Sequence, residues 1–485
     1  MKETINVNIL KFIILLLFVC ISGSQTKQQD DITVKQDEPI KLLNADSLHG
    51  FQNESGNVRE FIGNVRLAQV DVLVRSDRAL QYLDLNVADL FGNVVITQQD
   101  LTLKAPHINY NGNTKLAVAD GGVELKDKDV TLKADYGNYS TETYLANFTK
   151  NVKMWDNKST LKADSGVYSR NTHIADFYHH VIVEDDSAIT FANHVNYNRN
   201  NRNSFAYGNV YVKGKFTNVV LTGDTIFNIP KESYTKAYGQ PVLYQVDTIK
   251  AETYDSTVNE QTLLMNDTAK NTTYKFDTLS VSCDTMEAFR QADSARYVFT
   301  GNVEMARGNS YSKANKAIYF TDKEIIILTG SPVVWYDSTQ LHADSIVISL
   351  PQKRLNEIRA YGNAIAGSRD DTLNPDRINQ IMGDNVNVLI IQDTIRRITS
   401  YGNAKSLYFS ATTESDEGAA RNSSDSIIID FDMGKVDTIL WLGGIEGEYF
   451  PSVMFENNVQ KIYLPAFKWS DDKPRKKKIP VYSFK

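Results

Sequence analysis

The side chains that could perform acid–base or metal chemistry are few and scattered in this sequence. Of the seven histidines, only His179 and His180 are neighbours. Adjacent residues of a regular strand point to opposite faces, so these two could not both bind one metal ion. The run Glu184-Asp185-Asp186 offers paired carboxylates, the groups that hydrolyse glycosidic bonds in some parallel β-helix enzymes. Such runs are also common in solvated turns, and this is the interpretation we favour.

The sequence lacks the motifs of the common catalytic sites. It has no Gly-rich phosphate loop, no Gly-x-Ser-x-Gly elbow and no His-Glu-x-x-His zinc helix. Of the two cysteines, Cys20 lies in the N-terminal apolar run, so an exported chain would keep Cys283 alone and have no internal disulfide. We expect Cys283 to be a small buried apolar residue. We therefore expect no enzyme activity, no cofactor and no metal.

The N-terminus has the pattern of a secretory signal. Lys2 and Lys11 flank or precede an apolar run at 12–21, which at roughly ten residues is too short to span about 30 Å of hydrocarbon. Small residues follow at 22–24, so the mature chain is expected to begin near Gln25. The residues before Cys20 loosely resemble a lipobox, but Val19 stands where Gly, Ala or Ser is usual. Export without lipidation is therefore the favoured alternative.

The composition is that of a folded, acidic, strand-rich protein. The chain is 42% hydrophobic and 23% charged, with 25 Tyr and only 11 Pro. Its formal net charge of −7 makes nucleic acid and anionic membrane surfaces unlikely-fitting partners on electrostatic grounds. The basic run at 473–478 is expected to be part of a solvated tail.

The triplet Gly-Asn-Val, or a close relative, recurs along the chain. Its first six copies start 29 residues apart, at positions 63, 92, 121, 150, 179 and 208. Further copies follow with looser spacing, at 239, 301, 330, 362, 402 and 443. A second marker, Leu-x-Ala-Asp, ends 14 residues after the first in several units, at Asp135, Asp164 and Asp344. A fixed period of this length indicates a repeat architecture.

Apolar side chains alternate with polar ones between these markers. The pattern is clear in 94–97 and in 101–105, and it indicates strands with one apolar face. We expect the Gly-Asn pairs at tight turns between units, because both residues tolerate positive φ. Each unit would then hold two or three short strands, and neighbouring units must stack to bury the apolar face. The terminal strands would expose unpaired backbone groups.

The sequence therefore predicts an all-β protein, an elongated repeat β-jelly roll or β-solenoid built as an open folded sheet of about 29-residue units. The expected divisions are a signal peptide at 1–24, a flexible lead at 25–41, a regular repeat block at 42–240, a looser repeat block at 241–465 and a mobile C-terminal tail at 466–485. Whether the two blocks are separate domains or one continuous solenoid stays open.

Export, β repeats and the unit Gly-Asn-Val, strand, Leu-x-Ala-Asp, Tyr together resemble the LptA/OstA family, most clearly from Gly63 to Val210. The resemblance implies a periplasmic lipopolysaccharide-transport protein that helps to bridge the inner and outer membranes in outer-membrane assembly. It implies as partners the acyl chains of lipopolysaccharide, other Lpt-type β-jelly-roll proteins through edge-to-edge strand pairing, and further copies of this chain. The implied lipid-binding groove is lined by Val94, Ile96, Leu101, Leu103, Val123, Leu125, Leu132, Val152, Met154, Leu161, Val181 and Val183.

Two other functions stay open. A structural or adhesive β-solenoid would have a closed core and bind no lipid, whereas a polysaccharide-processing β-helix enzyme would need carboxylates clustered on one exposed face. An Asp-Ser/Thr pair before an apolar residue also recurs, as at 224–226, 247–249 and 277–279. We interpret it as a turn Asp before a strand, the alternative being an O-glycosylation motif that intact mass would test.

Overall fold

The structure is a computed structural model of the chain, and it describes residues 38–252, 272–291, 294–369, 374–410, 418–432, 434–455, 457–465 and 467–482. The predicted signal peptide at 1–24, its Cys20 and most of the predicted lead at 25–41 lie outside the described residues. In the described part of the chain, no helix has the length and apolar character that crossing a membrane requires. Almost all described residues belong to one compact unit, Pro39–Lys485.

The prediction of an all-β fold is confirmed, since the described residues form 32 strands and four short 3-10 helices. The first strands are β1 Lys41–Asn44, β2 Ser47–Asn53, β3 Gly56–Gln69, β4 Val72–Tyr82, β5 Val87–Gln98, β6 Leu101–Asn111, β7 Leu116–Asp120, β8 Val123–Asp127, β9 Val130–Ala134 and β10 Tyr136–Ser140. The middle strands are β11 Leu145–Trp155, β12 Ser159–Ser169, β13 Ile174–Asp185, β14 Ala188–Asn198, β15 Ser204–Gly214, β16 Val219–Ile229, β17 Tyr234–Tyr238, β18 Val242–Glu252, β19 Thr272–Ser282 and β20 Thr285–Arg290.

The remaining strands are β21 Ala295–Arg307, β22 Ser310–Phe320, β23 Ile325–Thr329, β24 Val333–Tyr336, β25 Thr339–His342, β26 Ser345–Ser349, β27 Glu357–Ser368, β28 Asn379–Ile391, β29 Thr394–Ser410, β30 Gly418–Asp432, β31 Lys435–Leu442 and β32 Glu446–Pro451. The 3-10 helices are η1 Pro230–Glu232, η2 Pro351–Lys353, η3 Ser452–Met454 and η4 Val459–Ile462.

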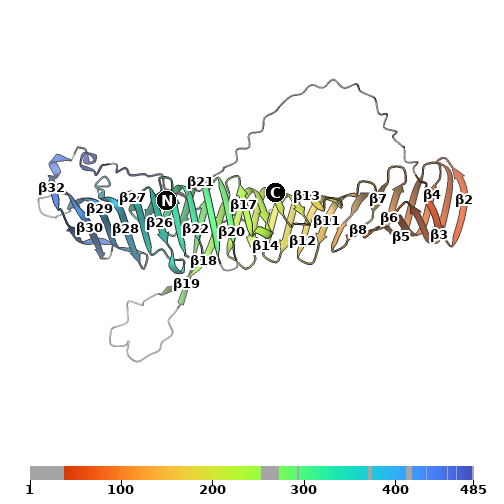
Figure 1. Cartoon of the computed structure of the whole chain (residues 1–485), viewed down its shortest axis with the longest axis horizontal. Helices are drawn as coiled ribbons and strands as arrows, with labels where there is room; N and C mark the ends of the chain where they lie inside the picture. Colours follow the sequence, from red (N-terminus) through yellow and green to blue (C-terminus); the bar gives the residue numbers. More distant parts are fainter. Residues whose placement is uncertain are drawn as a thin grey trace, which may run out of the picture. The chain divides into compact units, whose positions relative to one another are not determined.

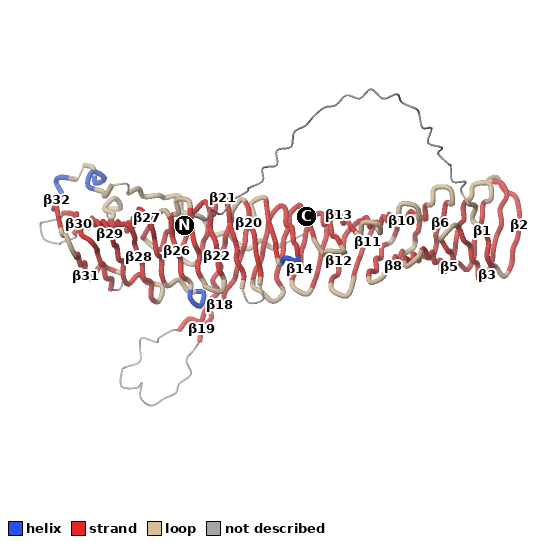
Figure 2. The backbone as a smooth tube through the Cα atoms, viewed as in Figure 1, coloured by secondary structure: helices blue, strands red, loops and turns tan. Residues whose placement is uncertain are grey.

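Successive long strands pair antiparallel with one another, and they follow one another along the unit from β2 to β32 (Figures 1 and 2). For example, β5 pairs over its full length with β4 before it and with β6 after it. Where a long strand is interrupted in its middle, two short strands replace it, as β7 and β8 do around Gly121-Gly122. The turns alternate between a short-turn edge, for example at 99–100, and a long-turn edge, for example at 112–115.

The Gly-Asn markers lie in the middle of long strands, so our expectation that they form turns between units is wrong. On β5, Gly92 and Asn93 have φ values of 70° and 44° and lie at a register shift between Phe91 and Val94. An irregularity of this kind is a β-bulge, which bends its strand. Equivalent shifts recur on the other long strands, and the sheet folds along the line that joins them. Turns and bulges both use positive φ, which is why the sequence does not separate them.

The two sequence markers meet at this fold line. Asn93 Nδ2 donates to Asp77 Oδ2 of the neighbouring strand at 2.8 Å. A Cβ on Gly92 would come within 2.6 Å of the same carboxylate oxygen, so the position needs glycine for space as well as for φ. The same hydrogen bond joins Asn64 to Asp46, Asn151 to Asp135, Asn302 to Asp284, Asn363 to Asp344 and Asn403 to Asp384.

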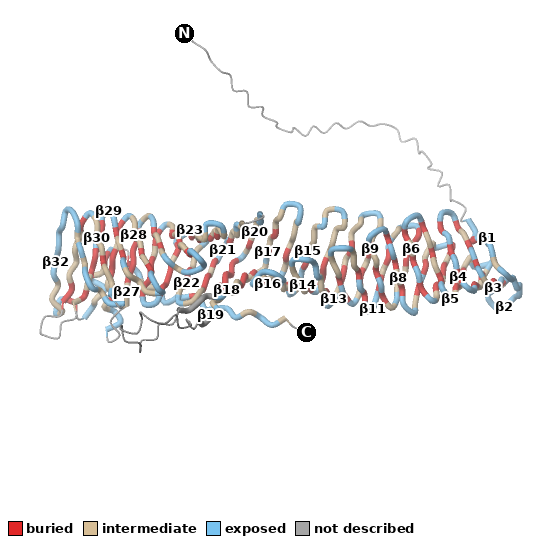
Figure 3. The backbone as a smooth tube through the Cα atoms, turned by 90° about the horizontal axis from the view of Figure 1, so that it is seen from below, coloured by how far each residue is buried: buried red, intermediate tan, exposed pale blue. Residues whose placement is uncertain are grey.

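Alternate residues from both halves of the folded sheet point inward and form one apolar cluster, which extends from Ile40 to Ile429 (Figure 3). Strand pairing continues through the expected block boundary at 240, because β16 pairs with both β17 and β18. Whether the blocks at 42–240 and 241–465 act as separate domains stays a prediction.

The residues after β32 fold back over the outer face of the sheet. Phe455, Leu464 and Phe467 pack against Ile365 and Leu407 in a second, smaller apolar cluster. These strand residues point away from the main interior, so the C-terminal segment provides the cover that a sheet with one solvated face would lack.

The tail at 466–485, which we expected to be mobile, lies against the sheet over its described residues 467–482. Trp335 Nε1 donates to the carbonyl of Ser470 at 3.1 Å, and Lys313 Nζ lies 2.6 Å from Asp472. The ring of Tyr482 stacks on Phe191 of β14, with centroids 4.5 Å apart. The tail therefore contacts strands far apart in the sequence. A basic composition alone does not reveal that acidic and aromatic partners lie along its path.

Candidate functional site

The twelve predicted groove residues all point into the interior of the folded sheet. Val183 is partly buried, and the other eleven have exposed fractions of 5% or less. These eleven are Val94, Ile96, Leu101, Leu103, Val123, Leu125, Leu132, Val152, Met154, Leu161 and Val181. The structure thus brings them together in one continuous apolar cluster whose space is filled by side chains. Their contact with a ligand stays a proposal.

The sequence neighbours of these residues face solvent. Lys104, next to Leu103, is exposed and lies 3.8 Å from Glu124. Lys153, next to Met154, is exposed and places its ammonium group 5.4 Å from the ring centre of Trp155. Inward and outward positions therefore alternate as the period of two requires, which provides matched pairs for experiments.

The short-turn and long-turn edges of the folded sheet meet along a seam of polar side chains, which our sequence reasoning missed. Gln69 of the short-turn edge donates to the carbonyl of Gly112 on the long-turn edge at 3.0 Å and accepts a hydrogen bond from Tyr110 Oη at 2.7 Å. One repeat later, Gln98 accepts from Tyr139 Oη at 2.9 Å. Burial raises the pKa of both tyrosines, so both hydroxyls stay neutral donors.

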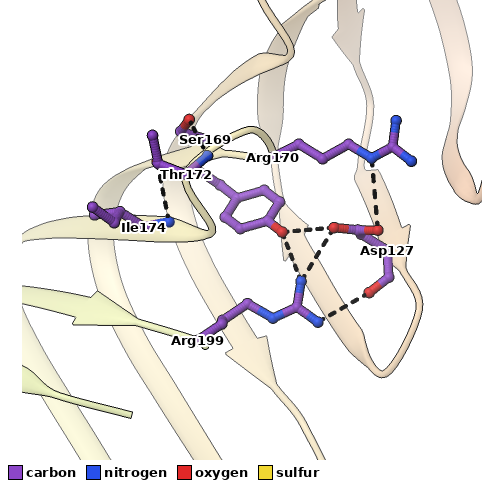
Figure 4. A network of polar contacts seen from close by, with 7 residues as sticks. Asp127, Ser169, Arg170, Thr172, Ile174 and Arg199 are labelled. Carbon is purple, nitrogen blue, oxygen red and sulfur yellow. Dashed lines mark hydrogen bonds and ion pairs between the residues drawn. The ribbon is translucent and has the colours of Figure 1, made fainter. Parts of the chain in front are cut away.

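The third rung of the seam is charged (Figure 4). Asp127 is 1% exposed, accepts from Tyr168 Oη at 2.6 Å and lies 3.1 Å from Arg199 Nη1. Arg170 Nε lies 3.9 Å from the other carboxylate oxygen. Burial and the hydrogen bond to Asp127 raise the pKa of Tyr168. The two guanidinium groups supply the pairing that a buried carboxylate requires.

A second charged cluster joins the two edges further along the chain. Asp247, which is 4% exposed, lies 3.1 Å from Arg307 Nη2 and 2.9 Å from Lys353 Nζ. Arg307 Nε also lies 2.8 Å from Asp277. Lys353 comes from the long-turn edge and the other three residues from the short-turn edge. Two of the recurring Asp-Thr pairs thus place their carboxylates in ion pairs; whether any such pair is glycosylated stays untested.

The apolar interior reaches solvent at both ends of the strand series. At the N-terminal end, Leu48 and Phe51 of β2 pair with inward residues of β3 but are 55% and 41% exposed, since no further strand covers them. At the C-terminal end, Ile439 and Trp441 of β31 are only partly buried. Among the described strands, β2 pairs only with β3, and β31 and β32 pair only with β30. Each end therefore offers an unpaired strand edge beside exposed apolar side chains.

The carboxylates singled out in the sequence have local structural contacts. Asp185 accepts hydrogen bonds from the backbone N–H groups of Ser187 and Ala188, at 2.7 and 2.8 Å, and so closes the turn after β13. Glu184 lies 2.9 Å from Lys215 Nζ. These contacts are those of a turn, in agreement with the interpretation favoured from the sequence.

His179 and His180 occupy the Gly-Asn position of the fold line on β13, both with positive φ, so they replace a bend residue rather than a turn residue. His180 Nδ1 lies 2.6 Å from Asp164. Burial raises the pKa of Cys283 to about 12, which keeps it a thiol. In the part of the chain that the structure describes, no group of three or more His, Cys, Asp or Glu side chains is arranged to hold a metal ion.

Two family models match parts of the chain. One, described as OstA-like protein, matches residues 37–192, and the other, described as LptA/(LptD N-terminal domain) LPS transport protein, matches residues 163–354. No curated protein matches the chain significantly. Among solved structures, the chain is similar to LptH of Pseudomonas aeruginosa, described as the LptA homologous periplasmic component of the conserved lipopolysaccharide transport device. The identity is 14% and the TM-score 0.23, over 29% of this chain and 93% of LptH.

Proposed function

The chain belongs to the OstA-like, LptA-type family of lipopolysaccharide-transport proteins, and from this premise we propose that it carries lipopolysaccharide through the periplasm with the acyl chains held in its apolar interior. The observation that carries the proposal is the continuous inward cluster from Ile40 to Ile429. Removing one CH₂ group from water is worth about 0.8 kcal/mol, so several acyl chains need apolar cover throughout an aqueous compartment. A continuous apolar wall would let a lipid advance without losing that cover.

Loading requires the two halves of the sheet to separate, because side chains fill the interior between them. The seam favours such a movement. No strand pairing crosses it within the described residues, and contacts such as those of Gln69, Gln98 and Asp127 join its two edges through side chains. Separating the edges would therefore break side-chain hydrogen bonds, each worth about 1 kcal/mol net, and leave the backbone ladder intact.

The ends of the strand series support a bridging role between the inner and outer membranes. The open edges of β2 and β31 could each pair with a strand of another Lpt-type β-jelly roll or of a second copy of this chain. The exposed inward side chains Leu48 and Phe51 would then continue the apolar path into the partner. Export by the segment at 1–24 would place the protein in the periplasm for this task.

The test is photocrosslinking in cells from a photoreactive residue at Leu103 or Met154, with lipopolysaccharide as the probed product. We expect a crosslinked band from these inward positions and none from the outward neighbours Lys104 and Lys153. A folded, exported protein that gives no band from either inward position would contradict the proposal.

A structural β-solenoid with a closed core is the second candidate function. It is favoured by the filling of the interior, where Ile96, Leu101 and Leu125 have no exposed surface. Such a protein would give no lipid crosslink at any interior position, so the same experiment separates the two functions.

A further inference from the structure

The regular seam stops after its third rung. Asp156 and Tyr197 lie 29 residues after Asp127 and Tyr168 and would form the fourth rung. Asp156 instead closes its own turn, accepting from the backbone N–H groups of residues 158 and 159 at 2.8 and 2.7 Å. Among the described residues, Asp156 makes no hydrogen bond or ion pair with the long-turn edge, and the Tyr197 hydroxyl makes no hydrogen bond. Arg199, which could face Asp156, reaches back to Asp127.

The interior is exposed where the fourth rung is missing. One inward slot of the repeat holds Leu67, Ile96, Leu125, Met154, Val183 and Val212 in successive units. The first four are 1%, 0%, 0% and 5% exposed, whereas Val183 and Val212 are only partly buried. Val219 and Leu221 on the next strand, β16, are partly buried too. A lateral opening, defined by Val183, Val212, Val219 and Leu221, therefore exposes the apolar interior on β13, β15 and β16.

This opening has a closed seam on both sides. On the N-terminal side, the Asp127 rung precedes it. On the C-terminal side, the cluster of Asp247 and Lys353 joins the two edges again, and the inward residues Phe299 and Val303 beyond it are 0% and 1% exposed. The opening is thus a bounded gap in an otherwise filled and latched interior, rather than the end of the core.

The rim of the opening carries cations on its long-turn side. Arg199 and Arg202 both lie in the turn between β14 and β15, and Arg202 is exposed. Both guanidinium groups act electrostatically on the Tyr197 hydroxyl, as do Asp156 and Asp185 of the short-turn side. An apolar gap with arginines on one rim suits an amphiphile whose anionic phosphate lies next to its acyl chains.

We propose that this lateral opening is where a phosphorylated lipid passes its acyl chains into or out of the interior, with its phosphate held by Arg202 and Arg199. The inference rests on the proposed lipid-carrying function and adds a place of exchange in the middle of the chain. Lipid would then not have to travel from one end to the other, and the latched parts on either side would retain it.

The experiment measures the uptake rate of a fluorescent, diphosphorylated lipid A by the purified full-length chain. Val212→Trp fills the opening, and Lys213→Trp, one residue on and outward-facing, is the matched control. We expect uptake to slow at least tenfold in Val212→Trp and to be unchanged in Lys213→Trp. Val183→Trp provides a second blocking variant if Val212→Trp lacks the wild-type circular dichroism spectrum.

The rim is tested separately with Arg202→Glu. It should slow the uptake of diphosphorylated lipid A at least fivefold and have no effect on a dephosphorylated analogue, because only the first carries the anionic group. Equal uptake by the blocking variants and wild type, together with lipid crosslinking at Leu103, would overturn the lateral opening and leave lipid carriage standing. No lipid crosslink anywhere in the interior would instead overturn the proposed function itself.

Discussion

At the residue level, the fold line depends on paired glycine and aspartate positions. Seven of its glycines have φ values between 70° and 79° and would place a Cβ within 2.1–2.6 Å of the Asp carboxylate on the preceding strand. These are Gly63, Gly92, Gly239, Gly301, Gly362, Gly402 and Gly443. Any other residue meets backbone strain and a steric clash together, so the repeat cannot exchange this glycine without moving its partner.

Gly92→Ala should therefore destabilise the protein by about 1–3 kcal/mol. The control is Gly50→Ala on β2, where no atom lies within 4 Å of the added Cβ, and it should change stability by less than about 0.5 kcal/mol. Urea unfolding followed by circular dichroism compares the two. Equal effects at the two positions would contradict the role assigned to the fold line.

The imidazole of His107 gives the folded state a dependence on pH. Burial lowers its pKa, but the hydrogen bonds and charges of Asp120, at 3.0 Å, and Asp89, at 3.3 Å, outweigh burial and raise the pKa above 6.5. A raised pKa means that the protonated form favours folding. This contribution is complete below pH 6.5 and disappears as the pH rises through the folded-state pKa. Thermal unfolding should show a smaller loss of stability from pH 6 to 8 in His107→Asn than in the wild type; an equal loss would contradict this.

At the level of elements, the seam shows which features can be predicted from the sequence and which cannot. The strands were predictable because alternation is local, and Leu101-Thr102-Leu103 displays it within three residues. The seam joins residues 41 to 43 positions apart, as in Tyr139 to Gln98, and no local pattern announces such a contact. The 29-residue recurrence of Tyr110, Tyr139, Tyr168 and Tyr197 was the available signal, yet it does not say that the last of these makes no hydrogen bond.

Removing one seam hydroxyl should be costly, because the partner stays buried. Tyr139→Phe leaves Gln98 Oε1 without its donor in a buried position, and we expect a loss of about 1–2 kcal/mol in unfolding free energy. Tyr136→Phe is the control, since Tyr136 is 49% exposed and its change should be near zero. Chemical denaturation of both variants measures the difference, and a neutral Tyr139→Phe would show that the seam adds nothing to stability.

The C-terminal segment makes a comparable prediction for a whole element. Deletion of residues 467–485 uncovers Trp335 and Phe191, which now contact Ser470 and Tyr482. Fully burying a large apolar side chain is worth roughly 1.5–3 kcal/mol, so the loss should reach about 2–5 kcal/mol. Binding of a hydrophobic dye and the thermal midpoint report it. A truncated chain with unchanged dye binding and midpoint would return the tail to the mobile role first expected.

At the level of the whole molecule, stacked repeats leave two surfaces that no further repeat covers. Stability in such an array is a sum of units and of interfaces between neighbours, so each missing neighbour leaves one interface unmade. At the N-terminal end, the unmade interface includes Leu48 and Phe51 and an unpaired edge of β2. Proteins that stay monomeric blunt such an edge with charge, whereas a protein that docks end to end needs it open.

Charges placed on this end should therefore block docking without touching lipid uptake. In Leu48→Lys/Phe51→Lys, each lysine would have to be buried against the partner's strand, at a cost of several kcal/mol for the pair. We expect concentration-dependent association of the wild type in sedimentation velocity and at least a tenfold weaker association of the variant. Lipid uptake through the central opening should be equal in both, because that opening lies on β13–β16 and the substitutions lie on β2. Association that survives both lysines would mean that copies meet through another surface, and the open edge of β31, with Ile439 and Trp441 beside it, is where the same substitutions should then be made.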